Sequence, residues 1–108
     1  MLRVYDEVLG VVRDLRGTLG ELERKDADLA RQMRRAAASV ALNIAEANGS
    51  RGGNRRLRFH SALGSMREVH SCLEVARAFG YVRNLEQSVA ATVNRIIGTL
   101  VRLVEGKR

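Results

Sequence analysis

The 108-residue sequence has no proline, a single cysteine and only four aromatic side chains, two Tyr and two Phe. β-rich domains of this size usually need aromatic strands and proline-marked turns, so these absences favour an all-α fold. Cys72 cannot form an intrachain disulfide, which is typical of a reducing, cytoplasmic setting. No run of 18 apolar residues occurs, and acidic residues interrupt the first apolar stretch, so we expect neither a membrane span nor an export signal.

Apolar residues recur in steps of three and four along four segments, which is the pattern of a helix with one buried face. A chain of this length forms one domain, and short connections between helices join antiparallel neighbours. The sequence therefore predicts an antiparallel up-down four-helix bundle over residues 1–108. The predicted helices cover residues 2–22, 27–48, 54–79 and 84–104.

Residues that favour helix ends flank these segments. Asp26 or Asp28 can cap the second helix and Asn54 the third, while Asn84 with Gln87 resembles a capping box for the fourth. Two stop signals follow the second and third helices, because glycine and asparagine tolerate the left-handed backbone. These signals are Asn48-Gly49 and Gly80.

Positive charge gathers in residues 31–58, where seven arginines face one acid, Glu46, out of a net charge of +7 for the whole chain. Clustered arginines attract polyanions and bind phosphates. Phe59 is the only aromatic residue beside them, and the helical period places it in the core, so binding would depend on backbone charge. The alternative for each arginine is a solvated surface. The candidate nucleic-acid-binding residues are Arg31, Arg34, Arg35, Arg51, Arg55, Arg56 and Arg58.

A line of polar residues crosses the otherwise apolar second helix. Its members are Gln32, Arg35, Ser39, Asn43 and Glu46. Two interpretations stay open: the line faces solvent, or it lies between neighbours and forms hydrogen bonds across an interface. Ser65 or Arg67 on the third helix could then be a partner of Arg35 or Glu46, and either role is structural.

The apolar faces of the first and last helices are wider than a monomeric bundle needs. We expect the extra residues to form an oligomer interface. A loose apolar seam with extra valines at its borders is the alternative. The residues are Val4, Val11, Ile97, Val101 and Val104.

Catalysis has little support in the sequence. His60 and His70 are ten residues apart, which is not a metal-binding spacing, and no acidic or cysteine cluster completes a site. We predict that His70 is a buried or interface residue and that Cys72 is a small core residue. We expect no enzyme activity, metal or cofactor.

Two motifs resemble those of a known family. Residues 33–46 read MRRAAASVALNIAE, and residues 57–68 read LRFHSALGSMRE, followed by FGYV at 79–82. These segments resemble the bacterial four-helix bundle proteins named after 23S ribosomal RNA intervening sequences. The resemblance implies a ring, commonly a homopentamer, and kinship with the accessory variability determinant of diversity-generating retroelements. Those relatives bind nucleic acid and a reverse transcriptase through a basic surface.

Two functions follow from these observations. The first is a non-enzymatic, oligomeric bundle that binds RNA or DNA non-specifically through its arginines, as an accessory to a reverse transcriptase or another nucleic-acid protein. The alternative is a protein-interaction or scaffolding module with no nucleic-acid role.

Overall fold

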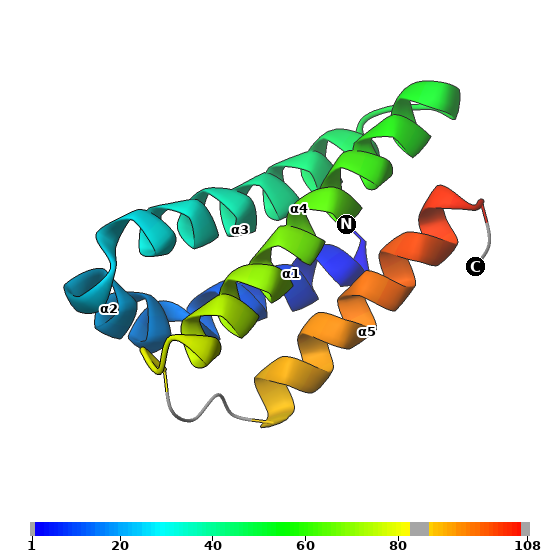
Figure 1. Cartoon of the computed structure of the whole chain (residues 1–108). Helices are drawn as coiled ribbons and strands as arrows, with labels where there is room; N and C mark the ends of the chain where they lie inside the picture. Colours follow the sequence, from blue (N-terminus) through cyan, green and yellow to red (C-terminus); the bar gives the residue numbers. More distant parts are fainter. Residues whose placement is uncertain (1, 83–86, 107–108) are drawn as a thin grey trace.

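The computed structural model describes residues 2–82 and 87–106. The apolar periodicity of the sequence corresponds to five α-helices in these ranges (Figure 1). No strand occurs in these two ranges, and the helices build one bundle around a single core, as the sequence predicts. The helices are α1 (Arg3–Asp14), α2 (Arg16–Lys25), α3 (Ala27–Asn48), α4 (Gly52–Ala78) and α5 (Gln87–Val104).

The first predicted helix, over residues 2–22, is wrong in two respects. It is divided at Leu15 into α1 and α2, and α2 continues to Lys25, three residues beyond the predicted end. Leu15 keeps a right-handed backbone, its N–H bonds to the carbonyl of Val11 at 2.9 Å, and its side chain is fully buried. The division is therefore a local irregularity that keeps the apolar seam on one face.

The helix ends follow the sequence only in part. The Asp26 carboxylate accepts the Leu29 N–H at 3.0 Å, which confirms it as the cap of α3. Helix α3 ends at Asn48, as the Asn48-Gly49 stop signal predicts, but Gly49 has φ −95°, so the left-handed backbone expected there is wrong. Asn54 is not a cap either, because α4 begins at Gly52, whose φ of +58° follows the extended Arg51.

At the other end of α4 the prediction is confirmed. Gly80 has φ +77°, its N–H bonds to the carbonyl of Arg77, and the Tyr81 N–H bonds to that of Ala76. This pair of bonds closes a helix with a glycine in the left-handed conformation. The predicted start of the last helix and the capping box from Asn84 to Gln87 fall in part on residues 83–86, outside the described residues.

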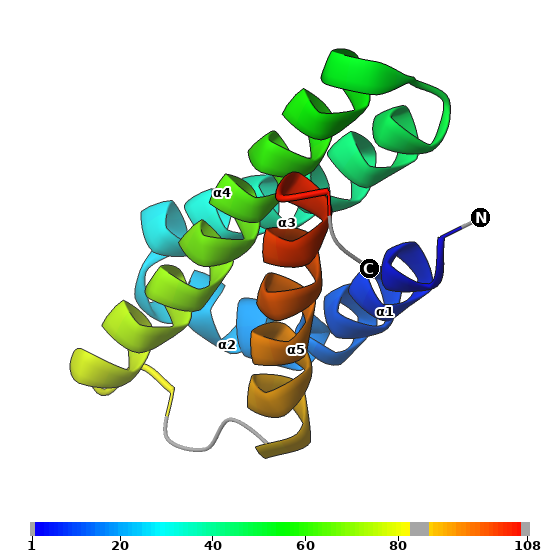
Figure 2. The ribbon, with the colours of Figure 1, turned by 90° about the vertical axis from the view of Figure 1, so that its right-hand side faces the viewer.

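Helices α3 and α4 form an antiparallel hairpin against which the other helices pack (Figures 1 and 2). Helix α1 contacts both α3 and α5, α2 contacts α3, and α5 contacts α4. The largest fully buried side chains come from every helix and include Leu15, Leu22, Met33, Ile44, Phe59, Met66, Ile96 and Leu100. Among the described residues, no helix has the length and hydropathy that a bilayer crossing requires.

Candidate nucleic-acid interface

The tip of the α3–α4 hairpin extends past the ends of α1 and α5 (Figures 1 and 2). Helix α4 has 27 residues and is the longest of the described helices. Its first three residues, at 52–54, are exposed. Its first turns and the loop before it hold the arginines Arg51, Arg55, Arg56 and Arg58, which we call the tip arginines. In the described part of the chain, no acidic side chain lies within 4.0 Å of any of them.

Arg55 differs from the other three tip arginines because it also holds the hairpin together. Its Nη1 donates a hydrogen bond to the carbonyl oxygen of Ala47 at 3.1 Å, in the last turn of α3. The same guanidinium lies 5.1 Å from the centroid of the Phe59 ring. A cation is favourable at both places, since a helix C-terminus and an aromatic face are each partly negative. Arg51, Arg56 and Arg58 are exposed to solvent.

The remaining predicted arginines lie toward the other end of α3. Arg31 pairs with Asp28 and Arg34 with Glu23, each at 2.8 Å, so their charge is largely compensated. Arg35 has no acidic partner within 4.0 Å among the described residues. The structure thus divides the seven predicted residues into a tip group, a compensated pair and Arg35.

The predicted polar line of α3 lies along a surface groove between α3 and α4. Ser39 and Ser65 share a hydrogen bond of 2.8 Å across this groove, and Asn43 donates to the carbonyl and hydroxyl oxygens of Ser39 at 2.9 and 3.1 Å. Ser65 is therefore a partner of Ser39 and not of Arg35 or Glu46. Gln32, Arg35 and Glu46 are exposed, whereas Ser39 and Asn43 are half-buried, and Ser39 bonds across the contact between α3 and α4. The line is therefore divided between the two interpretations.

Two adjoining hollows, of about 270 and 470 Å³, make up this groove, and both are lined by Arg35 and Ser39. The first is also lined by Gln32, Ala36, Ser65 and Glu68. The second is also lined by Ala38, Leu42, Asn43, Glu46 and Arg58.

The widened apolar faces that suggest an oligomer interface pack largely against other helices of the same chain. Val4 and Val11 are only 4% and 3% exposed, so the expectation that they form an exposed patch is wrong. The cause is that α1 packs against two helices, and a wider face is therefore buried. Ile97, Val101 and Val104 are half-buried and pack against the core.

Large apolar side chains are exposed at other positions that the sequence pattern did not indicate. Leu42 and Phe79 are each 66% exposed, Leu57 is 60% exposed and Val75 is 42% exposed. Phe79 stacks on Tyr81 with ring centroids 5.1 Å apart. Leu42 lines the α3–α4 groove, while Phe79 lies at the opposite end of α4 from the tip arginines.

The structure offers no constellation for catalysis within the described residues. Cys72 is buried, and this burial, followed by the negative charge of Glu68, raises the pKa of its thiol. Of the two roles predicted for His70, burial is wrong, because its side chain is 41% exposed and its Nδ1 lies 3.4 Å from Glu74. The interface role stays a prediction. No group of three potential metal ligands occurs in residues 2–82 and 87–106.

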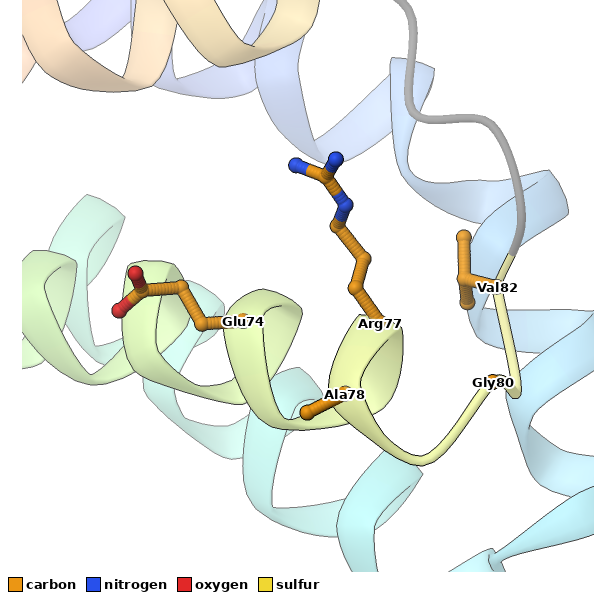
Figure 3. Close-up of a pocket in the computed structure, with 5 residues that line it drawn as sticks. All are labelled: Glu74, Arg77, Ala78, Gly80 and Val82. Atoms are coloured by element: carbon orange, nitrogen blue, oxygen red, sulfur yellow. The ribbon is translucent and has the colours of Figure 1, made fainter.

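A further hollow, of about 580 Å³, lies beside the end of α4 (Figure 3). Arg77 extends away from the helix on one side, Glu74 lies one turn earlier, and Val82 stands on the opposite wall. Ala78 and Gly80 complete the lining. An acid, an arginine and three small or apolar residues provide no pairing of a nucleophile with a base.

Comparison with known proteins places this geometry in a family. The model of the 23S rRNA-intervening sequence protein family matches residues 2–102. The chain belongs to this family. Its fold is shared with a solved structure of a protein of unknown function from the S23 ribosomal protein family of Bacteroides thetaiotaomicron. The TM-score is 0.82 and the identity 23%, over 94% of this chain and 97% of the other. No curated protein matches the sequence.

Membership of the intervening-sequence family confirms the resemblance that the motifs at 33–46 and 57–68 carry. The solved neighbour confirms the helical bundle, and at this identity it bears on the fold alone.

Proposed function

We propose that this protein binds the phosphate backbone of RNA or DNA, without sequence preference, at the tip of the α3–α4 hairpin. The observation that supports the proposal is the group of four tip arginines within eight positions of the chain, none of them within 4.0 Å of an acid among the described residues. Arg51, Arg56 and Arg58 are exposed and present their N–H donors and charge to a polyanion, and Arg55 adds its charge from the base of the tip.

Backbone contacts without base recognition follow from what surrounds these arginines. The Phe59 ring is 2% exposed and lies beneath Arg55, so no base can stack on it. Contacts to phosphate fix the position of a protein on nucleic acid and carry no sequence information. The proposed role is therefore binding or positioning of nucleic acid, with no chemistry performed by the bundle itself.

Assembly of identical chains is the second part of the proposal. The resemblance described above implies a ring of five, which would bring together twenty tip arginines from four per chain. A basic rim of this size would bind polyanions far more strongly than one chain, because several contacts act together. A reverse transcriptase or another nucleic-acid protein is the proposed partner of such an assembly.

The competing proposal is a scaffolding module that binds only protein. Exposed Leu42 and Phe79 favour it, since solvent-exposed apolar side chains of this size are common at protein interfaces. In that case the tip arginines serve solubility.

Salt-dependent binding distinguishes the two proposals. We expect a fluorescein-labelled 20-nucleotide RNA and a 20-base-pair DNA duplex to bind with micromolar or tighter affinity at 50 mM salt, measured by fluorescence anisotropy. We expect Arg51→Glu/Arg56→Glu to weaken both affinities by about tenfold or more, because two favourable charges become repulsive.

The matched control is Arg24→Glu/Arg77→Glu, which makes the same change in net charge at two exposed arginines away from the tip. We expect this variant to bind within about threefold of the unmodified protein, and circular dichroism to show equal helicity for all three proteins. No binding at 50 mM salt, or equal losses in both variants, would leave the scaffolding proposal.

A further inference from the structure

A large apolar side chain stands among the tip arginines, and attraction of phosphates does not account for it. Leu57 lies between Arg56 and Arg58 in the sequence and is 60% exposed. The three other exposed large apolar side chains of the described residues lie outside the segment 51–58. A ligand that binds the arginines and also covers Leu57 must present an apolar surface beside its charge.

The helical period places Leu57 on the outer face of α4. Each residue turns the helix by ~100°, so Phe59, two residues later, lies on nearly the opposite side. Phe59 is 2% exposed and belongs to the core, and Leu57 therefore points away from the core. Arg56 and Arg58 lie ~100° to either side of the leucine. Two exposed arginines thus flank it.

The neighbours of Leu57 along this outer face are small. Gly53, one turn before it, and Gly64, two turns after it, are exposed, and an added Cβ at either position would meet nothing within 4 Å. Ser61, one turn after it, is also exposed. A flat group can therefore approach the surface of the helix and lie against the leucine.

An exposed ring stands beside the leucine. His60 follows Leu57 by three residues, a spacing at which side chains on a helix are neighbours, ~5–6 Å apart at Cβ. His60 is exposed, and no acidic side chain lies within 4.0 Å of it among the described residues. Nucleic-acid bases stack on imidazole rings as well as on Phe, Tyr and Trp. We call Leu57 and His60 the outer pair.

We propose that the hairpin tip selects single-stranded nucleic acid, because the outer pair packs against an unpaired base. Arg56 and Arg58 then bind the phosphates on the two sides of that nucleotide. This inference rests on the proposed function, since it names the class of nucleic acid that the tip arginines hold. Every base has a flat face, so such packing tolerates any sequence and agrees with binding without sequence preference.

The difference between single and double strands lies in the accessibility of the bases. In a duplex the bases are stacked on each other, and a side chain reaches their faces only where a step is unstacked at a cost in free energy. In a single strand the faces are open to contact. Charge alone gives the opposite preference, because a duplex carries more phosphate charge per unit length. The order of the two affinities therefore separates packing on the outer pair from attraction by charge.

A bilayer of anionic lipid also combines charge with an apolar phase, but the tip is poorly suited to it. Helices that lie in a bilayer surface present a broad apolar face. The outer face of α4 around Leu57 carries glycine, serine and histidine instead. An isolated apolar side chain and one ring match the size of a single base.

Three probes with one 20-nucleotide DNA sequence test the preference by fluorescence anisotropy at 50 mM salt. They are the single strand, its duplex, and the single strand with abasic residues at its central positions, which keeps the phosphates and lacks those bases. We expect the unmodified protein to bind the single strand about tenfold more tightly than either other probe, as stacking of one base on a side chain allows.

Leu57→Ser/His60→Ser removes the outer pair and leaves the tip arginines in place. We expect it to weaken binding of the single strand about tenfold, and to change the affinities for the duplex and the abasic strand by less than about twofold. The matched control is His70→Ser/Val75→Ser, which changes a half-exposed histidine and an exposed valine of the same helix outside the tip. We expect the control to bind all three probes as the unmodified protein does, and circular dichroism to show equal helicity.

A variant with a larger apolar side chain tests the same contact in the opposite direction. Leu57→Phe offers a ring in place of the leucine, and we expect it to raise the affinity for the single strand about threefold and to leave that for the duplex unchanged. This gain does not depend on how well the double serine variant folds.

The outcomes distinguish this inference from the proposed function. A single strand bound no more tightly than the duplex, or equal losses for all three probes in Leu57→Ser/His60→Ser, overturns the inference and leaves binding by charge at the tip standing. No binding of any probe at 50 mM salt overturns both. Binding to vesicles of anionic phospholipid that depends on the outer pair, with the single-strand affinity unchanged in Leu57→Ser/His60→Ser, would assign the pair to a membrane surface and overturn the inference as well.

Discussion

Arg55 is predicted to stabilise the fold, whereas its neighbour Arg56 is not. Its guanidinium donates to the Ala47 carbonyl at 3.1 Å and lies 5.1 Å from the Phe59 centroid. Arg56 is exposed and has neither contact. Replacing each by methionine keeps most of the aliphatic stem and removes one charge, so the two variants differ only in the contacts that are lost.

The magnitude follows from the two contacts. A hydrogen bond from a charged donor contributes about 1.5 kcal/mol or more, and an exposed cation–π contact adds about 0.5 kcal/mol. Arg55 is half-exposed, and solvent screening reduces this sum. We therefore expect Arg55→Met to lower the free energy of unfolding by about 1.5 kcal/mol, and Arg56→Met to change it by less than about 0.5 kcal/mol.

Urea denaturation followed by circular dichroism measures this difference. With a slope of about 1.5 kcal/mol per molar urea for a domain of this size, the midpoint of Arg55→Met should fall by about 1 M. Arg55→Lys should lie between the two, because an ammonium keeps the charge but lacks the planar fork. Equal midpoints for Arg55→Met and Arg56→Met would refute the reasoning from these contacts.

Two further predictions concern the backbone and the buried thiol. Gly20→Ala should raise the free energy of unfolding by about 0.5 kcal/mol in thermal melts, since its added Cβ meets open space within α2, whereas Gly80→Ala should lower it by about 1 kcal/mol because φ is +77° there. The raised pKa of Cys72 predicts slow reaction with a disulfide reagent at pH 8 and fast reaction after unfolding. The thiol's stabilising contribution should be complete below its unfolded pKa and disappear as pH rises through the raised folded pKa, so the unfolding free energy should fall less at high pH in Cys72→Ala.

Much of the bundle could be predicted from local signals. Helix α3 was predicted at 27–48 because a capping aspartate, a regular apolar period and the Asn48-Gly49 pair all mark the same segment. The division at Leu15 could not be seen, since this residue stays on the apolar seam and keeps a helical backbone.

The candidate site was harder to predict because it depends on neighbours. The pairing of Arg31 with Asp28 follows a helical spacing of three, but the pairing of Arg34 with Glu23 needs the turn between α2 and α3. The sequence alone does not tell whether Val4 is buried or exposed, because the answer depends on the contacts of α1 with α3 and α5. Leu42 lies within an apolar stretch of the sequence, so its exposure could not be predicted either.

The salt dependence of RNA affinity tests the central claim most directly. If the four tip arginines each neutralise a phosphate, the logarithm of the association constant should fall with the logarithm of salt concentration with a slope of about −3 on single-stranded RNA. Arg51→Glu/Arg56→Glu should reduce this slope by at least about 1.4, while Arg24→Glu/Arg77→Glu leaves it unchanged. A slope near zero, or one that the tip variant does not alter, would contradict binding of nucleic acid at the hairpin tip.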